Sequence, residues 1–163
     1  MKRFLGALAS VLMLAVFASP AANAQSTPSA TITLLHGIPA TDVDVEAGGS
    51  NVFTNFQFGQ TQDLSSLAGQ TLTNLRVKAA GTSTVAIDAG NVALPSSGNH
   101  TVLAHLDAAG TPRLSVFTND VAKIAAGQGR LTVRHAAAAP AVDVRANGAV
   151  AFANLANPNE AKA

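Results

Sequence analysis

The chain has 163 residues, 12% of them charged, and a formal net charge of +1 at neutral pH. It contains no cysteine, which excludes disulfide bonds, thiol catalysis, thiolate metal ligands and haem attachment through cysteine. Its length is enough for one ordinary domain that is stabilised by an apolar core.

The first 24 residues have the three zones of an export signal. Lys2 and Arg3 form a basic start, residues 4–17 form an apolar run, and the small residues Ala22-Asn23-Ala24 follow. The run of about 14 residues fits a signal peptide and is short of the ~20 residues of a membrane-spanning helix. We therefore predict a signal peptide over residues 1–24 with cleavage after Ala24. The mature protein is expected to be secreted, extracellular or in the cell envelope, without an integral membrane span.

Removing this signal changes the charge balance of the chain. Lys2 and Arg3 leave with it, so eight basic residues remain against nine acidic ones and the formal net charge becomes −1. No basic patch is left to attract phosphate groups. We expect neither nucleic acid nor anionic lipid as a partner.

After a short polar lead, apolar residues recur with a period near two, in runs separated by Gly, Pro, Asn, Asp and Ser. This pattern is typical of half-buried antiparallel strands. The expected strands are Thr31–His36, Asp42–Glu46, Asn51–Phe53, Thr71–Lys78, Ser83–Asp88, His100–Leu106 and Arg113–Thr118. They predict an all-β fold, an antiparallel, immunoglobulin-like β-sandwich over residues 31–120, with an open barrel as the alternative.

Beyond a predicted linker at residues 121–129, the chain repeats itself at an offset of about 99 residues. TLLHGIPATDVDVEAGGSNVFTNF at Thr33–Phe56 aligns without a gap with TVRHAAAAPAVDVRANGAVAFANL at Thr132–Leu155. Equivalent pairs include His36 with His135, Asp44 with Asp143, and Phe53 with Phe152. A fixed offset of this kind indicates repeated folding units.

The second unit, residues 130–163, is much shorter than the first. The sequence therefore predicts one full repeat plus the first hairpin of a second, partial repeat. A lone hairpin is only marginally stable in water. We expect residues 130–156 to lie against an edge of the first domain or to mediate self-association.

These segments resemble a secreted family known as domain of unknown function 4397. Its repeats open with a strand, a histidine, a Pro-containing turn and a V-D-V strand. The matching segments are LLHGIPATDVDV (Leu34–Val45), VRHAAAAPAVDV (Val133–Val144), VLAHLDAAGTPRLSVFTND (Val102–Asp120) and GQGRLTVRH (Gly127–His135). Two departures are Ala138 in place of the proline and the early end of the second repeat, which suggests truncation. The resemblance implies a β-sandwich fold and an extracellular location, and it implies no activity because the family has none established.

The best candidates for chemistry are His36, Asp42 and Asp44. The two aspartates are two residues apart on an expected strand, so their side chains share a face and suit Ca²⁺. With His36 across the turn, they can instead orient an imidazole for general-base catalysis. Asp42 becomes Ala141 in the second repeat, whereas the histidine and the other aspartate recur. The favoured interpretation is therefore structural, with hydrogen bonds that fix the turn.

Two other groups carry weaker signals. His100 and His105 are five residues apart and fall on opposite faces of a regular strand, which argues against a shared metal. Phe56 and Phe58 are predicted to share a strand face, and burial in the core is favoured over an exposed stripe for a partner.

No familiar enzyme signature occurs in the sequence: there is no G-x-S-x-G, H-E-x-x-H, P-loop or dinucleotide fingerprint. We therefore predict an exported, non-enzymatic module without a cofactor, structural, adhesive or protein-binding, at the cell surface or outside the cell. Its expected partner is a protein or a cell-envelope component. The alternatives are a calcium-binding module that uses Asp42 and Asp44 and, third, a weak hydrolase.

Overall fold

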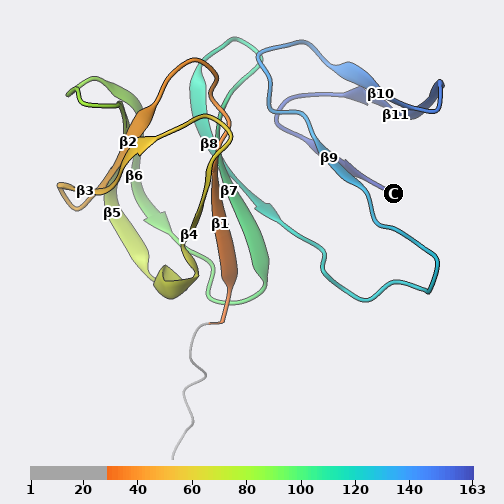
Figure 1. The fold of residues 1–163 in the computed structure, drawn as a ribbon, viewed down its shortest axis with the longest axis horizontal. Coiled ribbons are helices and arrows are strands. Elements are labelled where there is room, and N and C mark those ends of the chain that lie inside the picture. The colour runs from red at the N-terminus through yellow and green to blue at the C-terminus, as the bar shows by residue number, and fades with distance from the viewer. Residues whose placement is uncertain (1–28) are drawn as a thin grey trace, which may run out of the picture.

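Two four-stranded sheets face each other in the computed structural model, which describes residues 29–163 (Figure 1). The first sheet has the order β4-β1-β7-β8 and contains β1 (Thr31–His36), β4 (Thr61–Asp63), β7 (Asn99–Leu106) and β8 (Pro112–Thr118). The second has the order β3-β2-β5-β6 and contains β2 (Val43–Ala47), β3 (Ser50–Phe56), β5 (Thr71–Ala79) and β6 (Val85–Ala93). A single 3-10 turn, η1 (Ser65–Leu67), follows β4. The predicted all-β sandwich is confirmed, while the predicted signal lies outside the described residues.

The strand boundaries follow the sequence pattern to within one residue in β1, β2, β5, β7 and β8, and less closely elsewhere. Strands β3 and β6 extend beyond the expected ranges, and β4 was not expected because its three residues, TQD, show no alternation. Strand β1 pairs in parallel with β7, with Leu34 opposite Val102, whereas every other pairing in residues 29–163 is antiparallel. A parallel pair needs a long connection, and here it spans the whole second sheet.

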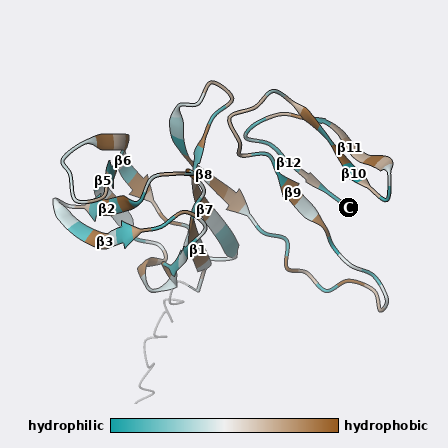
Figure 2. Cartoon of the chain, turned by 45° about the horizontal axis from the view of Figure 1, so that its top comes forward, coloured by the Kyte–Doolittle hydropathy of each residue, from teal (hydrophilic) through white to brown (hydrophobic). Residues whose placement is uncertain are grey.

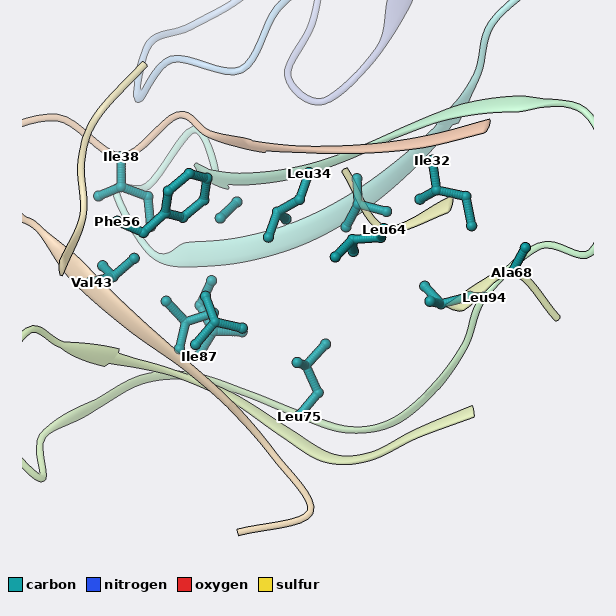
Figure 3. Packing of buried hydrophobic residues seen from close by; sticks show 14 of the residues in the cluster. Ile32, Leu34, Ile38, Val43, Phe56, Leu64, Ala68, Leu75, Ile87 and Leu94 are labelled. Atoms are coloured by element: carbon teal, nitrogen blue, oxygen red, sulfur yellow. The ribbon is translucent and has the colours of Figure 1, made fainter. Parts of the chain in front are cut away.

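The core lies between the two sheets and is built by alternate residues of the facing strands (Figure 3). Ile32 of β1 and Val43 of β2 are 0% and 1% exposed, and Phe56 closes one end at 2%. The remaining buried residues of this cluster are Ala30, Leu34, Ile38, Val45, Leu64, Ala68, Leu75, Val77, Ile87, Leu94, Val102 and Ala104. The period of two buries one side of β1, as the sequence predicts, whereas β2 and β7 are buried on both sides over part of their length.

The partial repeat, residues 130–163, contains four strands rather than one hairpin. They are β9 (Thr132–Arg134), β10 (Val142–Ala146), β11 (Ala149–Leu155) and β12 (Glu160–Lys162). Each is the counterpart of β1 to β4 at the same offset of 99 residues, and the register is kept: Thr33 pairs with Asp63 as Thr132 pairs with Lys162. The hairpin β10–β11 is as expected, and β12 was missed because EAK, like TQD, carries no strand pattern.

Polar side chains attach the partial repeat to the outer face of β7 and β8. Arg134 donates from Nη2 to Asn119 Oδ1 at 2.6 Å, and its guanidinium lies 4.6 Å from the centroid of the Phe117 ring. Glu160 accepts a hydrogen bond from Nε of the same arginine at 2.9 Å. Asn157 donates to the carbonyl of Leu106 at 2.8 Å. The partial repeat therefore lies beside the sandwich, without a strand-to-strand ladder to it in the described chain (Figures 1 and 2).

Burial differs sharply between equivalent positions of the two repeats. Ile32 is 0% exposed, whereas its counterpart Leu131 is 50% exposed. Val43 is 1% exposed, whereas its counterpart Val142 is 38% exposed. In the first repeat the two four-stranded sheets cover each other. The two-stranded sheets β12-β9 and β10-β11 of the partial repeat leave Leu131 and Val142 exposed, although Leu155, the counterpart of Phe56, is buried at 6%.

Substitutions at one equivalent pair should therefore have very different costs. Ile32→Ala removes a fully buried side chain and is expected to lower the free energy of unfolding by about 2–5 kcal/mol. Leu131→Ala should change it by less than about 0.5 kcal/mol in dilute solution, because its side chain is half exposed. Urea unfolding of the two variants measures this difference, and equal losses would contradict the burial described here.

Candidate functional site

His36 ends β1 and fastens the loop that carries the chain from the first sheet to the second. Its ring is fully buried, 5.5 Å from the ring of Phe56. Nε2 lies 2.8 Å from the carbonyl oxygen of Thr41, and Nδ1 accepts the N–H of Ile38 at 3.3 Å. Because a carbonyl oxygen only accepts, the proton is on Nε2. The neutral ring therefore uses both nitrogens inside the loop.

The partial repeat reproduces this arrangement. His135 is 6% exposed, and its Nε2 lies 2.9 Å from the carbonyl oxygen of Pro140, the counterpart of Thr41. The turn is kept although Ala138 replaces the proline of the first repeat. The recurring histidine thus makes the turn-fixing hydrogen bond that the repeat pattern favours.

The carboxylate of Asp44 bonds to strand β3 and to the turn between β5 and β6. Oδ1 accepts the N–H of Asn55 at 2.9 Å, and Oδ2 accepts the N–H of Gly81 at 3.0 Å. Asn55 has a φ of 52°, in the left-handed region where asparagine is enriched among non-glycine residues. The Asn55 hydrogen bond first, then that of Gly81 and the charge of Lys78, lower the pKa of Asp44 below its ordinary 3.8, against the opposing effect of burial. Asp143 repeats the first bond, accepting the N–H of Asn154 at 2.8 Å.

Asp42 lies apart from this arrangement. Strand β2 begins at Val43, so Asp42 precedes it, and the residue is exposed whereas Asp44 is 6% exposed. Its backbone carbonyl accepts the N–H of Ala80 at 2.9 Å. No group of three or more His, Asp or Glu side chains in residues 29–163 is arranged to hold a metal ion. The calcium interpretation stays a prediction, with one of its two carboxylates already bound to backbone amides.

The other two histidines are also buried and hydrogen-bonded. Both lie on β7. His100 Nε2 lies 2.8 Å from the carbonyl oxygen of Ser97. His105 Nδ1 lies 2.9 Å from the carbonyl of Leu106, so Nε2 accepts the hydroxyl of Ser115 at 2.8 Å.

The Ser115–His105 pair was not expected from the sequence, because the two residues meet only across β7 and β8. It has the hydrogen bond of a serine and its general base. The imidazole has no exposed surface, however, and its second nitrogen faces a carbonyl rather than a carboxylate. Ser115 is partly exposed, and the weak-hydrolase alternative stays a prediction.

An apolar groove of about 480 Å³ lies between the sandwich and the partial repeat. The sandwich contributes Pro39, Phe58 and Leu106, and the partial repeat contributes Val142 and Val144 among others. Phe58 is 57% exposed, so the prediction that Phe56 and Phe58 share a face is wrong: β3 ends at Phe56, which is 2% exposed. The repeat alignment could have indicated this surface, because it pairs Val142 of the shorter repeat with Val43, a core residue of the first repeat.

A family model described as "Domain of unknown function (DUF4397)" matches residues 30–145, from the start of the sandwich into β10. No curated protein and no solved structure matches the chain.

The two equivalent aspartates provide a matched test of this hydrogen bonding. Asp44→Asn should lower the melting temperature clearly more than Asp143→Asn, because it turns an amide donor toward the N–H of either Asn55 or Gly81. Asp143 accepts one such bond and is exposed. Thermal unfolding at neutral pH measures the pair, and equal shifts would contradict the role given to Asp44.

The pH dependence of the Asp44→Asn deficit follows from the lowered pKa. A carboxyl whose folded pKa lies below its unfolded value stabilises the fold above the unfolded value and loses that effect as pH falls through the folded one. The deficit should therefore be constant from neutral pH to about pH 4 and shrink below it. A deficit that persists undiminished in strong acid, measured by urea unfolding, argues against a stabilising carboxylate.

Proposed function

Because the family to which the chain belongs is described only as domain of unknown function 4397, we propose a function from the geometry: the protein is an exported, non-enzymatic β-sandwich module that binds protein. Its role is structural or adhesive, at the cell surface or outside the cell. The proposal includes export, which rests on the signal pattern of residues 1–24.

The observation that carries the proposal is the exposed apolar surface of the partial repeat. Leu131 and Val142 are 50% and 38% exposed, and Figure 2 shows hydrophobic stretches on the β10–β11 hairpin. Exposed apolar surface that continues into a groove is characteristic of protein interaction sites. Ile32 and Val43, the counterparts of these two residues, are core residues of the first repeat, so the chemistry of this surface suits another β-sheet.

The polar side chains support a binding role rather than catalysis. His36, His105 and Asp44 are 0%, 0% and 6% exposed, and their ring nitrogens and carboxylate oxygens bond to groups within the fold. A catalytic acid or base needs to reach the group that it protonates or deprotonates. The groove itself is lined mainly by apolar side chains and alanines.

Retention on cells tests the binding role. The purified chain should bind to the surface of cells of the organism that encodes it, and Val142→Ser should weaken binding about tenfold, because covering one valine contributes about 1.5 kcal/mol. Val116→Ser is the matched control, since Val116 is 48% exposed on β8 of the complete sandwich. Quantitative binding of labelled chain at increasing concentration gives the affinities. No retention, or equal loss in both variants, would remove the proposal.

Processing of the N-terminus tests export separately. The full chain, expressed in a host that secretes proteins, should be recovered outside the cytoplasm with Gln25 as its first residue. Ala24→Asp should block this cleavage, because the peptidase reads small residues, whereas Ala21→Asp changes a position that it does not read. Intact-mass measurement distinguishes the products. An intact chain that stays in the cytoplasm would contradict the export signal.

A further inference from the structure

Strand β10 has an edge that its counterpart in the first repeat uses for pairing. In the first repeat, β2 lies between β3 and β5. In the partial repeat, β10 pairs with β11 alone among the described strands. An unpaired strand edge is a template for another strand, and a two-stranded sheet is marginal without further partners.

The first repeat shows what charge pattern such a neighbour needs. Asp44 of β2 lies opposite Lys78 of β5, and Glu46 lies opposite Arg76, with Val45 opposite Val77 between them. Both acids of β2 thus face bases, and the Lys78 ammonium also contacts Glu46 at 2.7 Å. Opposite charges across a pair of strands stabilise it, and like charges destabilise it.

The partial repeat changes one of these charges. Its strand reads Val142-Asp143-Val144-Arg145-Ala146, so Arg145 stands where the first repeat has Glu46. A strand with the pattern of β5 would bring Arg76 opposite Arg145, which is repulsive. The strand that fits β10 instead carries an acid opposite Arg145 and a base opposite Asp143.

Strand β10 itself has that pattern. When two copies of it pair antiparallel around Val144, each Asp143 lies opposite Arg145 of the second copy, and the two Val144 residues face each other. The two charged side chains are exposed, and Val142 on the other face is 38% exposed. A two-fold axis relates the copies, so the same patch serves both.

This pairing also extends the apolar surface. Val142 and Val144 lie two residues apart and line the apolar groove together. Joining two β10–β11 hairpins gives a continuous sheet of four strands, the size of each sheet in the sandwich. The apolar sides of the two partial repeats then form one surface, as in an ordinary sheet.

We propose that two copies of this chain form a dimer by antiparallel pairing of β10 with β10, with Asp143 of each copy opposite Arg145 of the other. This inference rests on the proposed binding function and names its partner as a second copy.

Charge reversals test the pairing and its register in the full chain, as recovered from the expressing host. Asp143→Arg and Arg145→Asp each place two like-charged pairs across the interface, so either should raise the dissociation constant of the dimer at least about tenfold. Sedimentation velocity over a range of concentrations measures it. Arg145→Lys should retain the dimer, and Lys123→Asp, the same charge reversal in an exposed loop, should leave it unchanged.

Recombining the reversals makes the test specific to this pairing. A mixture of the Asp143→Arg and Arg145→Asp proteins brings opposite charges together at both positions and should form a heterodimer. The double variant Asp143→Arg/Arg145→Asp should again form a homodimer. Because Arg145→Asp leaves the Asp143–Asn154 hydrogen bond in place, it tests the interface even where Asp143→Arg loosens the hairpin.

A wild-type chain that stays monomeric at high concentration would overturn the inference, as would dimers that tolerate Arg145→Asp or a mixture that does not associate. Such a result leaves the proposed function standing if the chain is still retained on cells through Val142, and it then assigns that face to a different protein. Loss of cell retention with an intact dimer would instead count against the adhesive role alone.

Discussion

Each sheet of the sandwich is apolar on one side, and covering that side with the other sheet is the constraint on which the rest of the structure depends. The first repeat meets it with eight strands, whose facing residues form one core that includes Ile32, Val43 and Val102 (Figure 3). The partial repeat has the same first four strands in the same register and buries His135 and Leu155, yet Leu131 and Val142 are exposed. Local pairing is therefore kept without counterparts of β5 to β8 in the described chain, while burial is kept only in part.

Polar residues that recur in both repeats fix backbone geometry in each. His36 and His135 each bond to a carbonyl five residues on, and Asp44 and Asp143 each accept an amide eleven residues on. These bonds depend only on the segments that both repeats contain, which explains why they recur. The histidine and the aspartate therefore recur because each fixes the backbone of a turn or an irregular strand by a local hydrogen bond.

The residues that differ between the repeats carry the information about partners. Glu46 faces Arg76 inside the first repeat, and its counterpart Arg145 is exposed and has no cross-strand partner outside its own hairpin in the described chain. Phe58, an exposed side of the groove, corresponds to Asn157, which anchors the partial repeat to Leu106. Equivalent positions therefore serve contacts within the sandwich in one repeat and surface contacts in the other. The β10 edge, with Arg145, serves surface contacts.

The sequence by itself determined the strand pattern, the offset of 99 residues and the turn chemistry of His36, because alternation and short-range hydrogen bonds are local. It could not determine the parallel pairing of β1 with β7, since a period of two fixes which face is buried but not which strand lies alongside. Only the tertiary structure brought Gly81 to Asp44 across 37 residues, excluded Asp42 from that site and joined Ser115 to His105. It also decided that Phe58 and Val142 border a groove, because exposure depends on which strands cover a face.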